Sequence, residues 1–122
     1  MKALYNAIAA TTAAAAILAS PLAMAHATLK NATPAAGSVV EAAPKEIALT
    51  FNEAVEPAFS NITVADGAGK ELATEKARVD EANPAILRLA VPGLSVGTYS
   101  VSWAVAGHDG HRRKGDFKFT VK

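Results

Sequence analysis

The sequence predicts an all-β domain, a seven-stranded Greek-key β-sandwich or barrel of the immunoglobulin-like kind. After residue 25, apolar and polar residues alternate with a period of two through most of the chain, as in strands with one buried face. Proline, glycine and asparagine interrupt these runs at short intervals. No stretch in that part shows the 3.6-residue period of an amphipathic helix, so short strands in two sheets are expected.

Five runs carry the alternation, and in each of them the large apolar side chains occupy every second position and so share one face. The strands are expected at residues 46–51, 62–64, 87–91, 99–105 and 117–121. The spacing of Leu94, Gly97 and Tyr99 resembles the corner of such sandwiches at which a tyrosine hydroxyl bonds back to upstream backbone.

The first 25 residues are expected to be a secretory signal peptide. A positive residue precedes an alanine-rich apolar run at 3–19, and Ala-Met-Ala at 23–25 is a small-x-small cleavage site. A membrane anchor is the alternative, but the run is short for a bilayer and no charged stop signal follows it. We therefore expect a leader at 1–25 and an exported domain at 26–122 that is not embedded in the membrane.

The composition excludes several classes of function. The chain has 12 basic and 11 acidic residues and no cysteine, so it lacks the basic surplus of a nucleic-acid-binding protein and the thiolates of zinc fingers and iron–sulfur sites. Both methionines, Met1 and Met24, precede the expected cleavage site. The mature chain would then hold no sulfur ligand, which argues against a Cu(I) site because Cu(I) selects soft sulfur.

The three histidines fall in two places, and both could bind metal. As a terminal residue His26 would offer its α-amine, whose pKa is about 7.7–8, and its imidazole to one ion. Asp109 and His111, in the loop 107–111, are two positions apart and can point the same way. Three nitrogens and one oxygen suit tetragonal Cu(II) better than tetrahedral zinc. A chance cleavage before histidine and an ordinary polar turn are the alternatives.

With the residues around them, these motifs resemble the CopC family of periplasmic copper-resistance and copper-homeostasis proteins, in its short, Met-poor, YobA-like branch. The matching segments are 26–38, 43–53, 97–103, 109–111 and the closing 119–122. The resemblance implies a non-enzymatic protein that binds one Cu(II) per chain through His26, Asp109 and His111. It also implies that Glu53 is an axial or outer partner of the site, whereas the alternative is a solvated acid at a strand end.

The chain departs from the family pattern in two respects. Some members carry a Met-rich loop with a Cu(I) site, but residues 61–80 contain no methionine, so we expect that site to be absent. His108 matches no family ligand position and is interpreted as a solvated loop residue. The basic run 112–114 is either a solvated hairpin end or a docking patch for an inner-membrane copper permease of the CopD type, a partner that the resemblance implies.

Two other functions remain open at this point. A terminal histidine with a second histidine also forms the copper brace of polysaccharide monooxygenases, which are β-sandwiches. The few aromatic residues are assigned to the core, which leaves little for a flat sugar-binding face, and the Asp109 carboxylate would stabilise Cu(II) against reduction. A metal-free interaction module of the immunoglobulin type is the third hypothesis.

Overall fold

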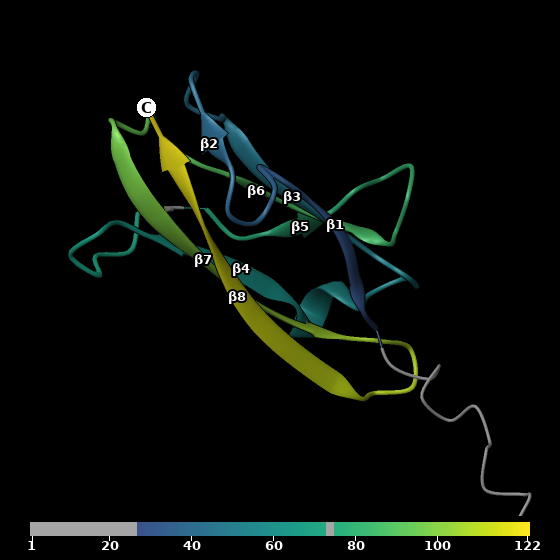
Figure 1. The fold of residues 1–122 in the computed structure, drawn as a ribbon. Coiled ribbons are helices and arrows are strands. Elements are labelled where there is room, and N and C mark those ends of the chain that lie inside the picture. Colours follow the sequence, from purple (N-terminus) through teal and green to yellow (C-terminus); the bar gives the residue numbers. More distant parts are fainter. Residues whose placement is uncertain (1–26, 73–74) are drawn as a thin grey trace, which may run out of the picture.

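The computed structural model describes residues 27–72 and 75–122, so the expected signal peptide and His26 lie outside the described residues. These residues form eight strands and one short 3-10 helix (Figure 1). The elements are β1 (Leu29–Thr33), β2 (Val39–Val40), β3 (Glu46–Phe51), η4 (Pro57–Phe59), β4 (Asn61–Ala65), β5 (Arg78–Val79), β6 (Ile86–Ala90), β7 (Gly97–Ala106) and β8 (Arg112–Val121).

The strands form two four-stranded sheets, which confirms the predicted all-β sandwich. One sheet has the order β1-β3-β6-β5 and the other the order β2-β8-β7-β4. Neighbours are antiparallel except β2 and β8, which pair in parallel. The prediction named seven strands, whereas the described residues form eight, of which β2 and β5 are only two residues long. No helix among the described residues is long and apolar enough to cross a bilayer.

The alternating residues form the core between the sheets. Every second side chain of β3 is buried, and the pattern continues in β4 and β6. Phe51 of β3 meets the edge of Trp103 of β7 with ring centroids 5.2 Å apart, so an aromatic contact links the two sheets. The largest fully buried side chains are Phe51, Phe119, Ile47, Leu49, Leu87, Leu89, Val64, Val101 and Val105. Full burial of one such side chain stabilises the fold by about 1.5–3 kcal/mol.

The tyrosine corner expected before β7 is present. The hydroxyl of Tyr99 donates a hydrogen bond of 2.6 Å to the carbonyl oxygen of Ser95. Leu94 is buried below this bond, and the Tyr99 ring stacks on Phe119 with centroids 5.6 Å apart. The corner therefore fixes the connection through which the chain enters the second sheet.

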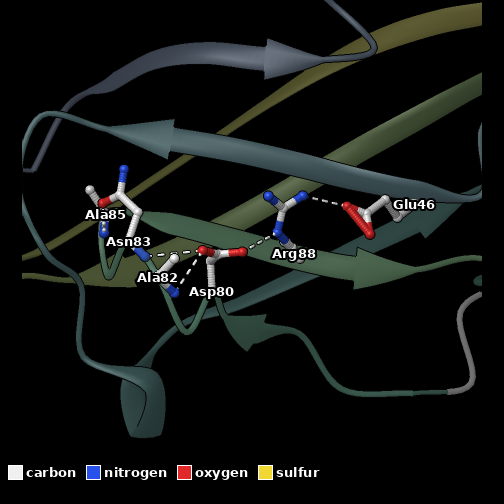
Figure 2. A network of polar contacts seen from close by, with 6 residues as sticks. All are labelled: Glu46, Asp80, Ala82, Asn83, Ala85 and Arg88. Atoms are coloured by element: carbon white, nitrogen blue, oxygen red, sulfur yellow. Dashed lines mark hydrogen bonds and ion pairs between the residues drawn. The ribbon is translucent and has the colours of Figure 1, made fainter.

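An arginine on the other sheet joins two strands and a turn (Figure 2). The Nη1 atom of Arg88, in β6, donates to Glu46 of β3 at 2.5 Å, and its Nε donates to Asp80 at 2.7 Å. The second oxygen of Asp80 accepts the backbone N–H groups of Ala82 and Asn83, each at 3.0 Å. The hydrogen bond from Arg88 is the largest cause that lowers the pKa of Asp80 below its usual 3.8.

The β7–β8 hairpin is longer than predicted. The sequence indicated a last strand at 117–121, but β8 begins at Arg112 and pairs with β7 through to Ala106. The side chains of Arg112, Arg113 and Lys114 are exposed, so this end of the strand shows no apolar alternation even though its backbone ladder continues. The basic run therefore lies on a strand, and the hairpin holds the loop 107–111 at one end of the sandwich.

Candidate metal centre

The loop between β7 and β8 is a tight turn closed by its own backbone. The N–H of Gly107 donates to the carbonyl of His111 at 3.2 Å, and the N–H of Gly110 donates back to Gly107 at 3.0 Å. Gly110 has a φ of 84°, in the left-handed region that favours glycine. This turn presents the side chains of residues 108, 109 and 111 on the exposed surface.

Within this turn the side chains of Asp109 and His111 are in contact, as their spacing predicted. Asp109 Oδ2 accepts a hydrogen bond from His111 Nδ1 at 2.8 Å, and Oδ1 accepts the His111 backbone N–H at 3.0 Å. The backbone bond, followed by the side-chain bond, lowers the pKa of Asp109 below its usual 3.8. The carboxylate is therefore ionised at neutral pH and can bind a cation without first losing a proton.

These two side chains lie close enough together to bind one metal ion. Asp109 Oδ2 and His111 Nδ1 are 2.8 Å apart in a hydrogen bond. Two ligands at about 2.0 Å from one metal and at a right angle to each other are also about 2.8 Å apart, but Nδ1 would have to lose its hydrogen before it could bind a metal. The role of the two residues as ligands stays a prediction.

Glu53 lies against the same loop. A methyl group built on Gly107 would overlap with Glu53 Oε1 and would lie 3.4 Å from Asp109 Oδ1. The lack of a side chain at Gly107 therefore lets the Glu53 carboxylate approach the turn that carries Asp109. Glu53 therefore lies beside the loop, and its role at a metal site stays a prediction.

The start of the described chain is fixed next to Glu53. Thr28 donates its backbone N–H to the side-chain oxygen of Asn52 at 2.7 Å and accepts the Asn52 N–H at 3.0 Å. Ala27 is buried, with 1% of its surface exposed. Figure 1 shows the start of β1 at the same end of the sandwich as the β7–β8 loop. The first described residues therefore lie at the same end of the sandwich as this loop, and His26 is outside the described residues.

His108 makes a contact that the sequence did not predict. Its Nδ1 lies 2.9 Å from Glu56 Oε1, between β3 and η4. Ser60, a buried polar residue, donates its hydroxyl to the Glu56 carbonyl at 2.7 Å and accepts the Ala106 N–H at 3.3 Å. No local sequence pattern links Glu56 to His108, because 52 positions separate them and only the tertiary fold brings them together.

The basic run beyond the loop includes a contact with an aromatic ring. The Arg112 guanidinium lies 5.5 Å from the centre of the Phe59 ring, a cation–π arrangement on the exposed surface. Within 27–72 and 75–122, no group of three or more histidine, aspartate or glutamate side chains is arranged to hold a metal ion. The expected donor set takes two of its four atoms from His26, which is outside these ranges.

Comparisons with known proteins identify the family. Residues 29–122 match the model of the CopC domain. The chain is 39% identical to the protein YobA of Escherichia coli K12 over 108 residues, 86% of each chain. It is 36% identical to copper resistance protein C of Pseudomonas syringae pv. tomato over 118 residues, 92% of this chain and 93% of that protein.

A solved structure gives the same result. The crystal structure of CopC from Methylosinus trichosporium OB3b superposes with a TM-score of 0.75 at 40% identity, and the match covers 80% of this chain and 94% of that one. The fold, the sequence and the domain model therefore agree. The chain belongs to the CopC family.

Proposed function

We propose that the chain is a periplasmic Cu(II)-binding protein of copper homeostasis and resistance, with one tetragonal site per chain. The observation that carries this proposal is the 2.8 Å contact between Asp109 and His111, on a loop beside the start of the described chain. CopC proteins are copper-binding carriers rather than enzymes, so the copper-brace enzyme is not retained. One relative of known structure, PcoC of Escherichia coli, is itself described as a copper resistance protein.

Four donor atoms form the proposed site. Cleavage after Ala25 would free the α-amine of His26, which with its own imidazole forms a six-membered chelate ring on the metal. Asp109 and His111 would supply a carboxylate oxygen and a third nitrogen. In the precursor the nitrogen of residue 26 is an amide, so the full set exists only after export and cleavage.

The oxidation state follows from the kinds of donor. Nitrogen and oxygen ligands in a plane suit Cu(II), whereas Cu(I) prefers thioethers and thiolates. PcoC is described as methionine rich. Here the two methionines, Met1 and Met24, lie in the proposed leader. We therefore propose Cu(II) as the cargo, without a separate Cu(I) site.

Glu53 is proposed as an axial or outer partner of the metal. Its carboxylate lies against Gly107 and close to the turn that carries Asp109. A second carboxylate at this distance would add negative charge around a divalent cation without completing the equatorial plane. Outer partners of this kind orient ligands and tune metal affinity.

The sharpest experiment adds a single glycine before His26 of the processed chain. The imidazole is kept, but the chelating amine moves one residue away, so Cu(II) binding should weaken and the electron paramagnetic resonance (EPR) spectrum should change. The matched comparison is the chain that begins at His26. Unchanged affinity and an unchanged spectrum would refute the terminal chelate.

A second measurement tests the rest of the donor set. Nitrogen hyperfine structure in the EPR spectrum of the Cu(II)-loaded chain should count three nitrogens, and His111→Ala should reduce the count by one. Copper titration should reach one tight equivalent. Failure of the correctly processed chain to bind copper would favour the metal-free interaction module.

The proposed partner is an inner-membrane copper permease of the CopD type. Arg112, Arg113 and Lys114 are exposed on β8 directly after the metal loop. A cationic strand beside the site could align the loop with an acidic face of such a partner. Reversal of these charges should slow copper transfer to the permease without changing equilibrium copper binding, and equal transfer rates would contradict this docking role.

A further inference from the structure

The contact between Glu56 and His108 lies beside the proposed copper ligands without including them. His108 Nδ1 lies 2.9 Å from Glu56 Oε1, and both side chains are partly exposed, by 70% and 41%. A carboxylate only accepts hydrogen bonds, so the Nδ1 atom carries the hydrogen and donates it. His108 directly precedes Asp109, so this bond holds the loop at its first exposed residue.

The backbone on either side of this contact is already paired. Glu56 donates its N–H to the Ala106 carbonyl at 2.8 Å, and Val55 forms an isolated bridge with Gly107. The Ser60 hydroxyl connects the Glu56 carbonyl to the Ala106 N–H. The segment 55–60 thus supports the end of β7, and the Glu56 side chain extends this support from the strand onto the turn.

The turn also holds hydrogen bonds between its own residues. Asp109 bonds within the turn to His111, and the N–H of Gly110 bonds to Gly107. The Glu56–His108 bond joins a side chain of this turn to another part of the fold. It therefore restricts the direction in which the turn faces.

We propose that Glu56 and His108 form a latch that positions the copper-binding loop, with neither residue acting as a ligand. This inference rests on the proposed function, because it concerns the orientation of Asp109 and His111 toward the metal. The latch restricts the orientation in which the loop presents both ligands. Since the contact is exposed, it opens at modest cost and controls how fast copper leaves.

Three variants test the latch. Glu56→Ala and His108→Ala should each speed Cu(II) dissociation into excess chelator by about threefold to tenfold, the range expected for an exposed hydrogen bond. The double variant should behave like either single variant, because the two residues act through one bond. Glu56→Gln keeps an oxygen that accepts from Nδ1 and should restore most of the slow rate.

The EPR spectrum separates positioning from general stability. Glu56→Ala should shift the copper hyperfine splitting while the nitrogen count and the thermal midpoint of the metal-free chain stay close to those of the wild type. Glu41→Ala, which removes an exposed glutamate between β2 and β3, is the matched control and should change neither the rate nor the spectrum. Additive effects of the single variants, or no effect of either, would overturn the latch.

A measurement without metal keeps the test distinct from that of the copper site. In the metal-free chain, Glu56→Ala should speed amide hydrogen exchange of Gly110, whose N–H closes the turn. Faster exchange supports the latch even if the glycine extension before His26 refutes the terminal chelate. Unchanged exchange in both Glu56→Ala and His108→Ala would overturn the latch even if copper binds as proposed.

Discussion

Gly107→Ala tests how the Glu53 carboxylate reaches the metal loop. The added methyl group would overlap with Glu53 Oε1, and its next neighbour would be Asp109 Oδ1 at 3.4 Å, an ordinary contact. The overlapping atom is the far end of a flexible side chain rather than backbone. Glu53 should therefore rotate away while the loop keeps its conformation.

The size of the effect on stability follows from two opposing contributions. A Glu53 side chain displaced into a poorer rotamer costs about 0.5–1.5 kcal/mol. Replacing glycine by alanine where the backbone is unstrained stabilises the fold by about 0.4–1 kcal/mol through the unfolded chain. The variant should thus unfold within about 1 kcal/mol of the wild type. In a Glu53→Ala background only the favourable contribution remains, which gives a coupling of about 1 kcal/mol.

Urea unfolding of the wild type, the two single variants and the double variant measures the coupling between Gly107 and Glu53. The EPR spectra of the copper-loaded forms report changes around the metal. Gly107→Ala and Glu53→Ala should shift the copper spectrum in the same direction, because both remove the carboxylate from the loop. The reasoning fails if Gly107→Ala has the same effect on unfolding in both backgrounds. A spectrum that neither variant alters would instead contradict the role of Glu53 beside the metal.

Three further variants test the scaffold. Tyr99→Phe removes a 2.6 Å hydrogen bond and should lower the free energy of unfolding by about 1 kcal/mol. The thermal midpoint should fall by about 4–8 °C, and an unchanged midpoint would contradict this prediction. Asp80→Asn should destabilise the fold at pH 7, and the loss should shrink in acid. The folded pKa of Asp80 is lowered, so its carboxylate stabilises the fold above pH 3.8 and loses this effect as the pH falls through the folded pKa. A pH-independent difference in thermal midpoint would refute that assignment. Gly115→Ala places a methyl group 2.6 Å from Trp103 Cζ2, so it should lower the free energy of unfolding by about 1–3 kcal/mol. It should also change the emission of the single tryptophan, and unaltered fluorescence would count against this contact.

Alternation identified the strands wherever one face is buried and the other is solvated. Ile62 and Val64 lie inward on β4, and the residues of 46–51 alternate as expected. The same logic did not locate β1, in which no residue is fully buried, nor β2 and β5, since two residues carry no period. It also missed the first half of β8, where Arg112 and Lys114 continue the ladder past the core and no apolar face is needed.

The site was predictable only as far as its residues are close in sequence. Asp109 and His111 could be paired because two positions separate them, and the structure places them in contact. Gly107 is unremarkable in the sequence, because its effect is to make room for a side chain 54 positions earlier. No sequence pattern marked Glu56 as a neighbour of this loop. Such contacts depend on the packing of one sheet against the other, which strand periodicity does not specify.

The proposed ligands lie near opposite ends of the mature chain, His26 shortly before β1 and the other two residues between β7 and β8. β1 is an edge strand of one sheet, whereas the loop 107–111 connects two strands of the other. A metal ion held by His26 and by this loop would therefore act as a reversible crosslink across the sandwich, closing a ring of more than eighty residues. Since an unfolded chain cannot align the two ends, copper loading would raise the resistance of the domain to heat and proteolysis. Resistance to protease would then report how much of the protein carries copper.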